Sequence, residues 1–129
     1  ETFCSASAVQ SYARKLSAET EEDTILKSVR PGSITAKMVF EAAVEGDEIS
    51  KKVVDRFIHY LSVGIANLIN IFSPEVIVIG GGLAGAYDSY IDRLYEEVKT
   101  KIIFKNLPFA KIVPAMLGND AGIIGAAML

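Results

Sequence analysis

Four closely spaced glycines at the end of an apolar run are the residues of this sequence best suited to binding a ligand. The stretch VIVIGGGLAGAY, residues 76–87, places Gly80, Gly82 and Gly85 in the spacing G-x-G-x-x-G. A strand that ends in glycines brings bare backbone to the carboxyl end of a parallel sheet, where no Cβ blocks an approaching ligand. The spacing indicates a nucleotide-binding edge, although a tight strand-to-helix turn without any ligand would also explain it.

The same spacing is the fingerprint of a flavin or nicotinamide site, but two features disfavour that hypothesis. A dinucleotide site needs an acidic residue ~20 positions further on to hold the ribose. That region here reads KTKIIFKN, residues 99–106, and contains no acid. The fingerprint also normally opens its domain, whereas these glycines begin at position 80 of 129. A different nucleotide is therefore the better hypothesis.

The remaining polar residues form no recognisable catalytic or metal-binding motif. His59 is the only histidine, and we expect it on the surface of a helix with Asp55, four residues earlier, as its partner. Cys4 is the only cysteine, which excludes an intrachain disulfide; we expect a small apolar residue on a helix, in a reducing, cytoplasmic setting. Asn67 and Asn70 are expected to bond to backbone inside a packed core. We predict no catalytic residue and no metal ligand in this chain.

The composition is that of one globular domain at most. Half of the 129 residues are hydrophobic, 22% are charged and the net charge is -3. This balance gives no electrostatic reason to expect nucleic-acid or anionic-membrane binding through this segment. The most apolar segment, residues 57–72, is shorter than the ~20 residues that span a bilayer, so we expect a buried helix there.

The hydrophobic pattern predicts an α/β chain that is rich in helix and contains one parallel β-α-β unit. The long helix should be buried on most sides in its second half, and the first strand should be covered on both faces. Pro114 indicates that the second strand is an edge or carries a bulge. The expected helices cover residues 2–15, a short segment from Thr35 to Gly46, 47–72, 86–103 and 118–129. Asn119 or Asp120 is expected to cap the last helix. The expected strands cover residues 75–80 and 110–117.

Three stretches, in this order, resemble the C-terminal part of the ROK family of repressors, open reading frames and kinases. They are ETFCSASAV at the start, ITAKMVFEAAVEGDE with IANLINIFSPEVIVIGGGLAG in the middle, and LGNDAGIIGAAML at the end. Within the family, the chain is most similar to bacterial glucokinases. The resemblance implies a ribonuclease H-like fold of the actin and hexokinase type, with residues 1–129 forming the C-terminal portion of a two-lobed sugar-kinase domain.

The resemblance also implies roles for particular residues. Gly80, Gly81 and Gly82 match the adenosine motif, in which glycine backbone lies against the adenine nucleotide of ATP. Glu1 resembles the glutamate that ends the family's zinc segment, G-C-x-E, and hydrogen-bonds a sugar hydroxyl. The zinc ligands, the phosphate-binding D-x-G-x-T motif and the catalytic aspartate are expected upstream of Glu1, together with most of the Mg²⁺-ATP site.

The resemblance implies a glucokinase-like, ATP-dependent kinase that phosphorylates the 6-hydroxyl of a hexose, and this chain alone is expected to be inactive. A kinase for another hexose or an N-acetylated amino sugar, and a sugar-sensing ROK repressor, remain alternatives. The expected partners are a small-molecule sugar and ATP, with no nucleic acid through this segment and no membrane. A homo-oligomer is expected, as is common in the family.

Overall fold

The computed structural model describes residues 2–105 and 108–116, in which three α-helices and a two-stranded sheet accompany one long helix. The predicted helix over 118–129 lies outside these residues. In chain order the elements are α1 (Ala6–Glu19), the 3-10 helices η1 (Ile25–Ser28) and η2 (Pro31–Ser33), α2 (Ala36–Val44), α3 (Glu48–Phe72), β1 (Val76–Ile79), the 3-10 helix η3 (Ala84–Ser89), α4 (Ile91–Lys101) and β2 (Lys111–Pro114).

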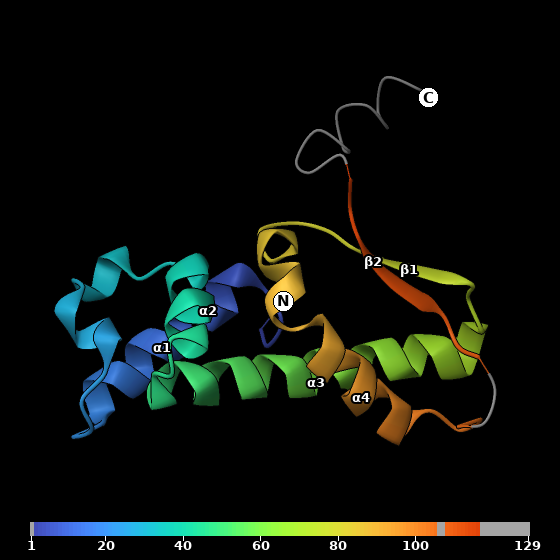
Figure 1. Ribbon diagram of the computed structural model, residues 1–129, viewed down its shortest axis with the longest axis horizontal. Coiled ribbons are helices and arrows are strands. Elements are labelled where there is room, and N and C mark those ends of the chain that lie inside the picture. Colours follow the sequence, from blue (N-terminus) through green and yellow to red (C-terminus); the bar gives the residue numbers. More distant parts are fainter. Residues whose placement is uncertain (1, 106–107, 117–129) are drawn as a thin grey trace.

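The helix α3 is the central element of the fold (Figure 1), with α1, α2 and α4 packed against it. It begins where predicted, because the Asp47 carboxylate accepts a hydrogen bond from the backbone N–H of Ser50 at 2.8 Å. It ends at Ser73, whose left-handed φ of 46° turns the chain toward β1. None of the described helices combines the length and apolar character needed to cross a bilayer.

The prediction that the second half of α3 is buried on most sides is wrong for the described residues. Leu68 is 45% exposed, and Ile71 and Phe72 are each 71% exposed, because α4 and a two-stranded sheet cover only part of this end. Asn67 is exposed as well. Asn70 does bond to backbone as expected: it donates to the carbonyl of Lys101 and accepts from the N–H of Ile103.

Local capping and tertiary packing explain where the other helices begin. The hydroxyls of Ser5 and Thr35 cap α1 and α2. The helix predicted over 86–103 is interrupted, with a 3-10 turn first and α4 only from Ile91. The buried ring of Tyr90 causes the interruption, since it packs against Phe40 and Phe57 while its hydroxyl donates to the Leu83 carbonyl. This burial, together with the nearby Tyr87, raises the pKa of Tyr90 to about 12.

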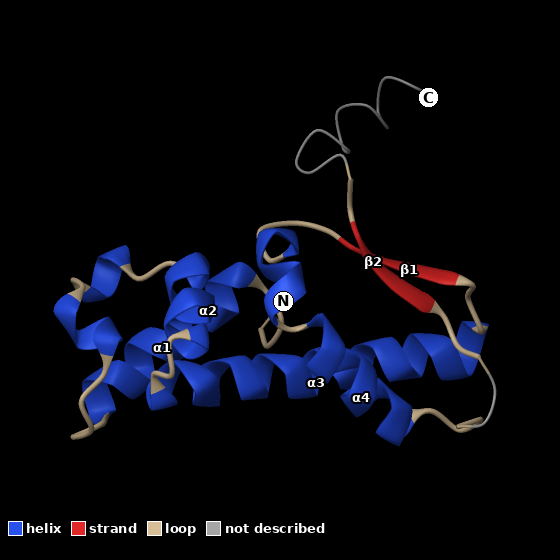
Figure 2. Cartoon of the chain, in the orientation of Figure 1, coloured by secondary structure: helices blue, strands red, loops and turns tan. Residues whose placement is uncertain are grey.

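The two strands are parallel neighbours joined through α4, which confirms the predicted β-α-β unit (Figure 2). Pro114 pairs with Ile79 at the last position of the ladder, where a missing N–H does least harm. The expectation that β1 is covered on both faces is wrong for the described residues. Val76 and Val78 are 48% and 59% exposed, whereas Ile77 and Ile79 pack on the core.

The two edges of this sheet differ. Two tyrosines close the outer edge of β2: the Ile112 N–H donates to the Tyr95 hydroxyl at 2.9 Å, and the Tyr87 hydroxyl donates to the Ile112 carbonyl at 2.6 Å. The outer edge of β1 pairs with no strand among the described residues. The sheet is therefore closed on one side and open on the other.

Candidate functional site

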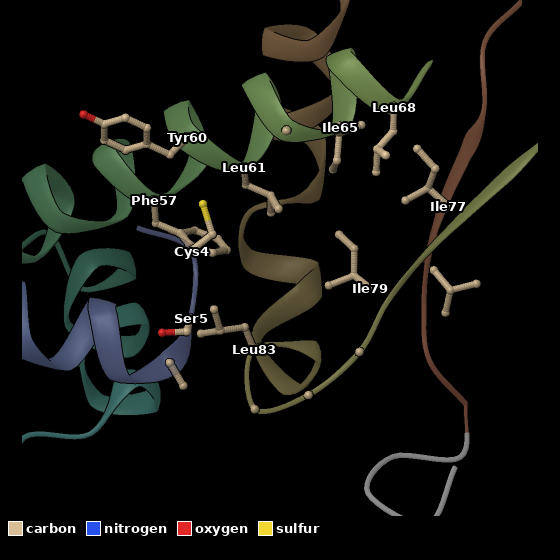
Figure 3. Close-up of a pocket in the computed structure, with 16 residues that line it drawn as sticks. Cys4, Ser5, Phe57, Tyr60, Leu61, Ile65, Leu68, Ile77, Ile79 and Leu83 are labelled. Carbon is tan, nitrogen blue, oxygen red and sulfur yellow. The ribbon is translucent and has the colours of Figure 1, made fainter. Parts of the chain in front are cut away.

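A cavity of about 710 Å³ lies between β1, α3 and the start of α1, and the predicted glycines form part of its wall. Figure 3 shows side chains from these three segments converging on it, with Cys4, Leu61 and Ile79 among them. The lining residues are Cys4, Ser5, Ala6, Phe57, Tyr60, Leu61, Gly64, Ile65, Leu68, Ile77, Val78, Ile79, Gly80, Gly81, Gly82 and Leu83.

The glycine loop is held against two other segments. Gly81 has a φ of +79°, a conformation that side-chain-bearing residues rarely adopt. A Cβ placed on Gly82 would lie 3.3 Å from the Cβ of Ala6, and one placed on Gly80 would lie 3.7 Å from the Cβ of Ala115. The absence of side chains therefore lets the loop approach the first turn of α1 closely, and it leaves bare backbone along the cavity.

The walls of the cavity carry no charged side chain among the described residues. Aliphatic side chains, one phenylalanine and one tyrosine dominate, and polar groups come from Ser5, Cys4, Tyr60 and the exposed loop backbone. Such a lining suits a flat heterocycle, because the apolar walls would bury the faces of its ring and the loop backbone could hydrogen-bond to its polar edge. It does not suit a triphosphate, which requires cationic partners or a dedicated cradle of N–H groups.

The structure places the predicted site residues as follows. Gly80, Gly81 and Gly82 lie together on the cavity wall. Gly85 lies in η3, outside the lining, and Glu1 lies outside the described residues. The spacing G-x-G-x-x-G does not lead into an α-helix N-terminus, as a dinucleotide site requires, since η3 is a short 3-10 helix.

Sequence reasoning missed the contribution of residues 4–6 to this wall. Cys4 was expected on a helix, but it lies in the turn before α1, half-buried against the cavity. Burial raises the pKa of its thiol above the ordinary value, although the nearby Arg56 guanidinium acts in the opposite direction. The inward stripe of α3, including Phe57 and Ile65, was predicted as core and also lines the cavity. The three- and four-residue spacing could not show that part of this stripe borders a cavity.

His59 is a surface residue, as predicted, but its expected partner is wrong. Its Nδ1 lies 3.0 Å from Glu97 Oε1 on α4, and Asp55 pairs with Arg93 instead. Burial alone would raise the pKa of Glu97, but hydrogen bonds from Lys101 and His59 outweigh it and lower that pKa. The contact between α3 and α4 decides these pairs, which helix periodicity alone does not reveal.

The described residues contain no group of three or more His, Cys, Asp or Glu side chains able to hold a metal ion. The cavity wall likewise carries no carboxylate. Mg²⁺ prefers hard oxygen ligands such as carboxylates and phosphates. The described residues therefore offer no metal site of this kind.

Comparison with known proteins places this geometry in a family. The model of the ROK family matches residues 1–129. The chain belongs to the ROK family. It is 37% identical over 130 residues to a glucokinase of Halalkalibacterium halodurans, covering 100% of this chain and 39% of that protein. It is 26% identical over 125 residues to a xylose repressor of Caldicellulosiruptor bescii, covering 97% of this chain and 31% of the repressor.

A solved structure shows the same relationship. A ROK family glucokinase from Streptomyces griseus, in complex with glucose and AMPPNP, matches with a TM-score of 0.84 and 26% identity, over 99% of this chain and 43% of that one. The fold class predicted from the sequence is thereby confirmed. The chain spans only about two fifths of the length of the glucokinases it matches. The ROK assignment also leaves the flavin or nicotinamide hypothesis without support.

Proposed function

We propose that this chain is the C-terminal portion of an ATP-dependent sugar kinase of the glucokinase type. One observation carries the proposal: an uncharged cavity joins the glycine loop to the segment that follows Glu1, in a chain similar to a glucokinase solved with glucose and AMPPNP. The predicted nucleotide-binding glycines and residues 4–6, which follow Glu1 closely in the sequence, line the same cavity and support this proposal.

In this proposal the glycine loop binds the adenosine part of ATP. Gly80, Gly81 and Gly82 lie with their backbone against the purine, because their missing side chains leave room for a flat ring. The absence of charge on the described walls supports the adenosine end over the phosphate end. We also propose that Glu1 contacts a hydroxyl of the sugar, as the resemblance to the family implies.

The chemical step depends on residues outside this chain. The sugar 6-hydroxyl oxygen attacks the γ-phosphorus, the bond to the ADP oxygen breaks, and the hydroxyl proton passes to a base. We propose that an aspartate upstream of Glu1 is that base, and that Mg²⁺ and a structural zinc are also held upstream. Phosphoryl transfer requires the sugar oxygen and the leaving ADP oxygen in line at the γ-phosphorus, with the base and Mg²⁺ in place, so we expect the chain alone to be inactive.

The nucleotide role is tested by Gly81→Val in the full-length protein that carries this chain. A β-branched residue is strained at a φ of +79°, so the loop must change shape. We expect the KM for ATP to rise on the order of tenfold or more, which corresponds to about 1.4 kcal/mol of lost binding, while glucose binding without nucleotide is unchanged. Gly32→Ala is the matched control, since a Cβ there meets nothing within 4 Å. An unchanged KM for ATP in Gly81→Val would contradict the glycine assignment.

Two alternatives remain within the family. The similarity to a xylose repressor supports a sugar sensor that transfers no phosphate. An ATP-coupled assay with glucose, other hexoses and N-acetylated amino sugars separates the hypotheses: turnover of any sugar supports a kinase and identifies its substrate, whereas sugar binding without turnover supports a repressor. We further propose a cytoplasmic homo-oligomer that binds sugar and ATP and contacts neither membrane nor nucleic acid through this segment.

A further inference from the structure

Gly64 lies in the interior of α3 and forms part of the cavity wall. The other α3 residues in this wall have large side chains; they are Phe57, Tyr60, Leu61, Ile65 and Leu68. Leu61 precedes Gly64 by three residues and Leu68 follows it by four, so the three residues lie on one face of the helix. Gly64 therefore leaves a gap in this face between two leucines, and we call this gap the Gly64 notch.

Neither the backbone nor the packing of the described residues requires a glycine at position 64. Gly64 has no positive φ, in contrast to Gly46 and Gly81. A Cβ placed on it would meet nothing within 4 Å. A glycine inside a helix is unfavourable relative to alanine, because it loses more conformational freedom on folding. Among residues 2–105 and 108–116 no contact compensates this cost, so the use of the Gly64 notch lies in the space that it leaves open.

The Gly64 notch opens into the part of the cavity that β1 and the glycine loop border. Figure 3 shows Leu61 and Leu68 extending from α3 toward Ile79, the last residue of β1. Gly80 to Gly82 follow Ile79 directly and line the same cavity. The cavity, about 710 Å³, has the size of a small-molecule site. Two surfaces without side chains, from two different elements, therefore border one cavity and leave room between them for a flat ring.

We propose that Gly64 is a further nucleotide-binding residue, which admits the purine ring of ATP between α3 and the glycine loop. This inference rests on the proposed kinase function and adds the second wall of its base-binding site. A side chain at position 64 would project between Leu61 and Leu68 into the space of the ring, because the three positions share a helix face. Leu68 is 45% exposed, and the bound ring covers part of this apolar surface.

The test is a size series at position 64, Gly64→Ala and Gly64→Leu, in the full-length protein that carries this chain. The KM for ATP, the KM for the sugar, kcat and the melting temperature are measured for each variant. We expect the KM for ATP to rise about threefold in Gly64→Ala and on the order of tenfold or more in Gly64→Leu, with the KM for the sugar within about twofold of the wild type. The melting temperature of Gly64→Ala should equal or exceed that of the wild type, because alanine is the better helix former.

Weaker nucleotide binding without a loss of stability distinguishes a ligand contact from a packing role. Val63→Leu is the matched control, because Val63 neighbours Gly64 on α3, is 36% exposed and lies outside the cavity lining. It should leave both KM values unchanged. A KM for ATP in Gly64→Leu equal to that of Val63→Leu would overturn the role of Gly64. A melting temperature of Gly64→Ala well below that of the wild type would also overturn it, since another part of the protein would then pack into the Gly64 notch.

A failure of the proposed function gives a different result. A wild-type protein that phosphorylates no sugar with ATP contradicts the kinase assignment itself. A wild-type protein that does so, with a KM for ATP that does not respond to the size of residue 64, contradicts only the role of Gly64. The two failures are therefore distinguishable.

Discussion

The two ends of α3 lie in very different surroundings. Around its first half, Val53 and Phe57 are almost completely buried, and Phe40 of α2 and Tyr90 pack against the ring of Phe57. Around its second half, Ile71, Phe72 and the outward side chains of β1 remain exposed. The first half completes its core within the described residues, whereas the second half presents apolar surface beside the candidate site. The two regions therefore differ in burial: the helices around the first half of α3 bury their apolar side chains, whereas the second half of α3 and β1 leave theirs partly exposed.

The largest expected difference in the free energy of unfolding is between alanine substitutions of two phenylalanines, one buried and one exposed. Phe40→Ala removes a ring that is 3% exposed and packed against Phe57 and Tyr90, so we expect a loss of about 4 kcal/mol in the free energy of unfolding. Phe72→Ala removes a ring that is 71% exposed, and the change should stay within about 0.5 kcal/mol. Urea unfolding of the full-length protein measures both. Comparable losses in the two variants would show that Phe72 is buried by residues other than 2–105 and 108–116.

A smaller loss in the free energy of unfolding is expected when the buried hydrogen bonds of Asp47 are removed. The Asp47 carboxylate caps α3 and also accepts hydrogen bonds from the Thr24 hydroxyl at 3.0 Å and the Ile25 N–H at 2.9 Å. Asp47→Ala leaves these buried donors unpaired, and we expect a loss of about 2 kcal/mol at pH 7. The exposed Asp23→Ala is its control and should cost less than about 0.5 kcal/mol.

The contribution of Asp47 should also depend on pH. Burial alone would raise its pKa, but hydrogen bonds from Ser50, Thr24 and Ile25 outweigh it and lower that pKa. The stabilisation is therefore complete above the unfolded-state value of about 4 and is lost as pH falls through the lower folded-state value. The stability difference between wild type and Asp47→Ala should shrink only in strong acid. A difference that instead shrank toward high pH would refute this assignment.

The smallest expected loss of stability comes from removing a tyrosine hydroxyl that hydrogen-bonds the outer edge of β2. Tyr95→Phe removes the hydroxyl that accepts from the Ile112 N–H and donates to the Ala110 carbonyl at 3.4 Å. We expect a loss of about 1 kcal/mol, typical of a part-buried hydrogen bond. Tyr60→Phe provides the control, with no expected loss, because the exposed Tyr60 makes no hydrogen bond through its hydroxyl among the described residues. Thermal unfolding of the three proteins checks this, and equal stability of all three would show that water replaces the hydroxyl without cost.

The sequence predicted most of the elements because their signals are local. Caps such as Asp47 and Thr35, the apolar spacing of α3 and the Pro114 position each follow from neighbours along the chain. The interruption at Tyr90 and the pairing of His59 with Glu97 depend on contacts between α3 and its neighbours, so no local pattern reveals them. For the site, the glycines were found from their spacing. The part played by Cys4 to Ala6 was missed, since only the fold brings the start of the chain beside residue 82.

Among residues 2–105 and 108–116 no strand pairs with the outer edge of β1, and this has a practical consequence for handling the chain. An unpaired strand edge offers backbone donors and acceptors to any other extended segment, and the side chains of Val76 and Val78 add apolar surface. The tyrosine hydroxyls prevent such pairing along β2 but leave β1 unprotected. When residues 1–129 are produced as a separate polypeptide, we expect intermolecular strand addition at β1, and hence precipitation, to limit the concentration that can be reached. A lysine in place of Val78 is the change most suited to prevent it.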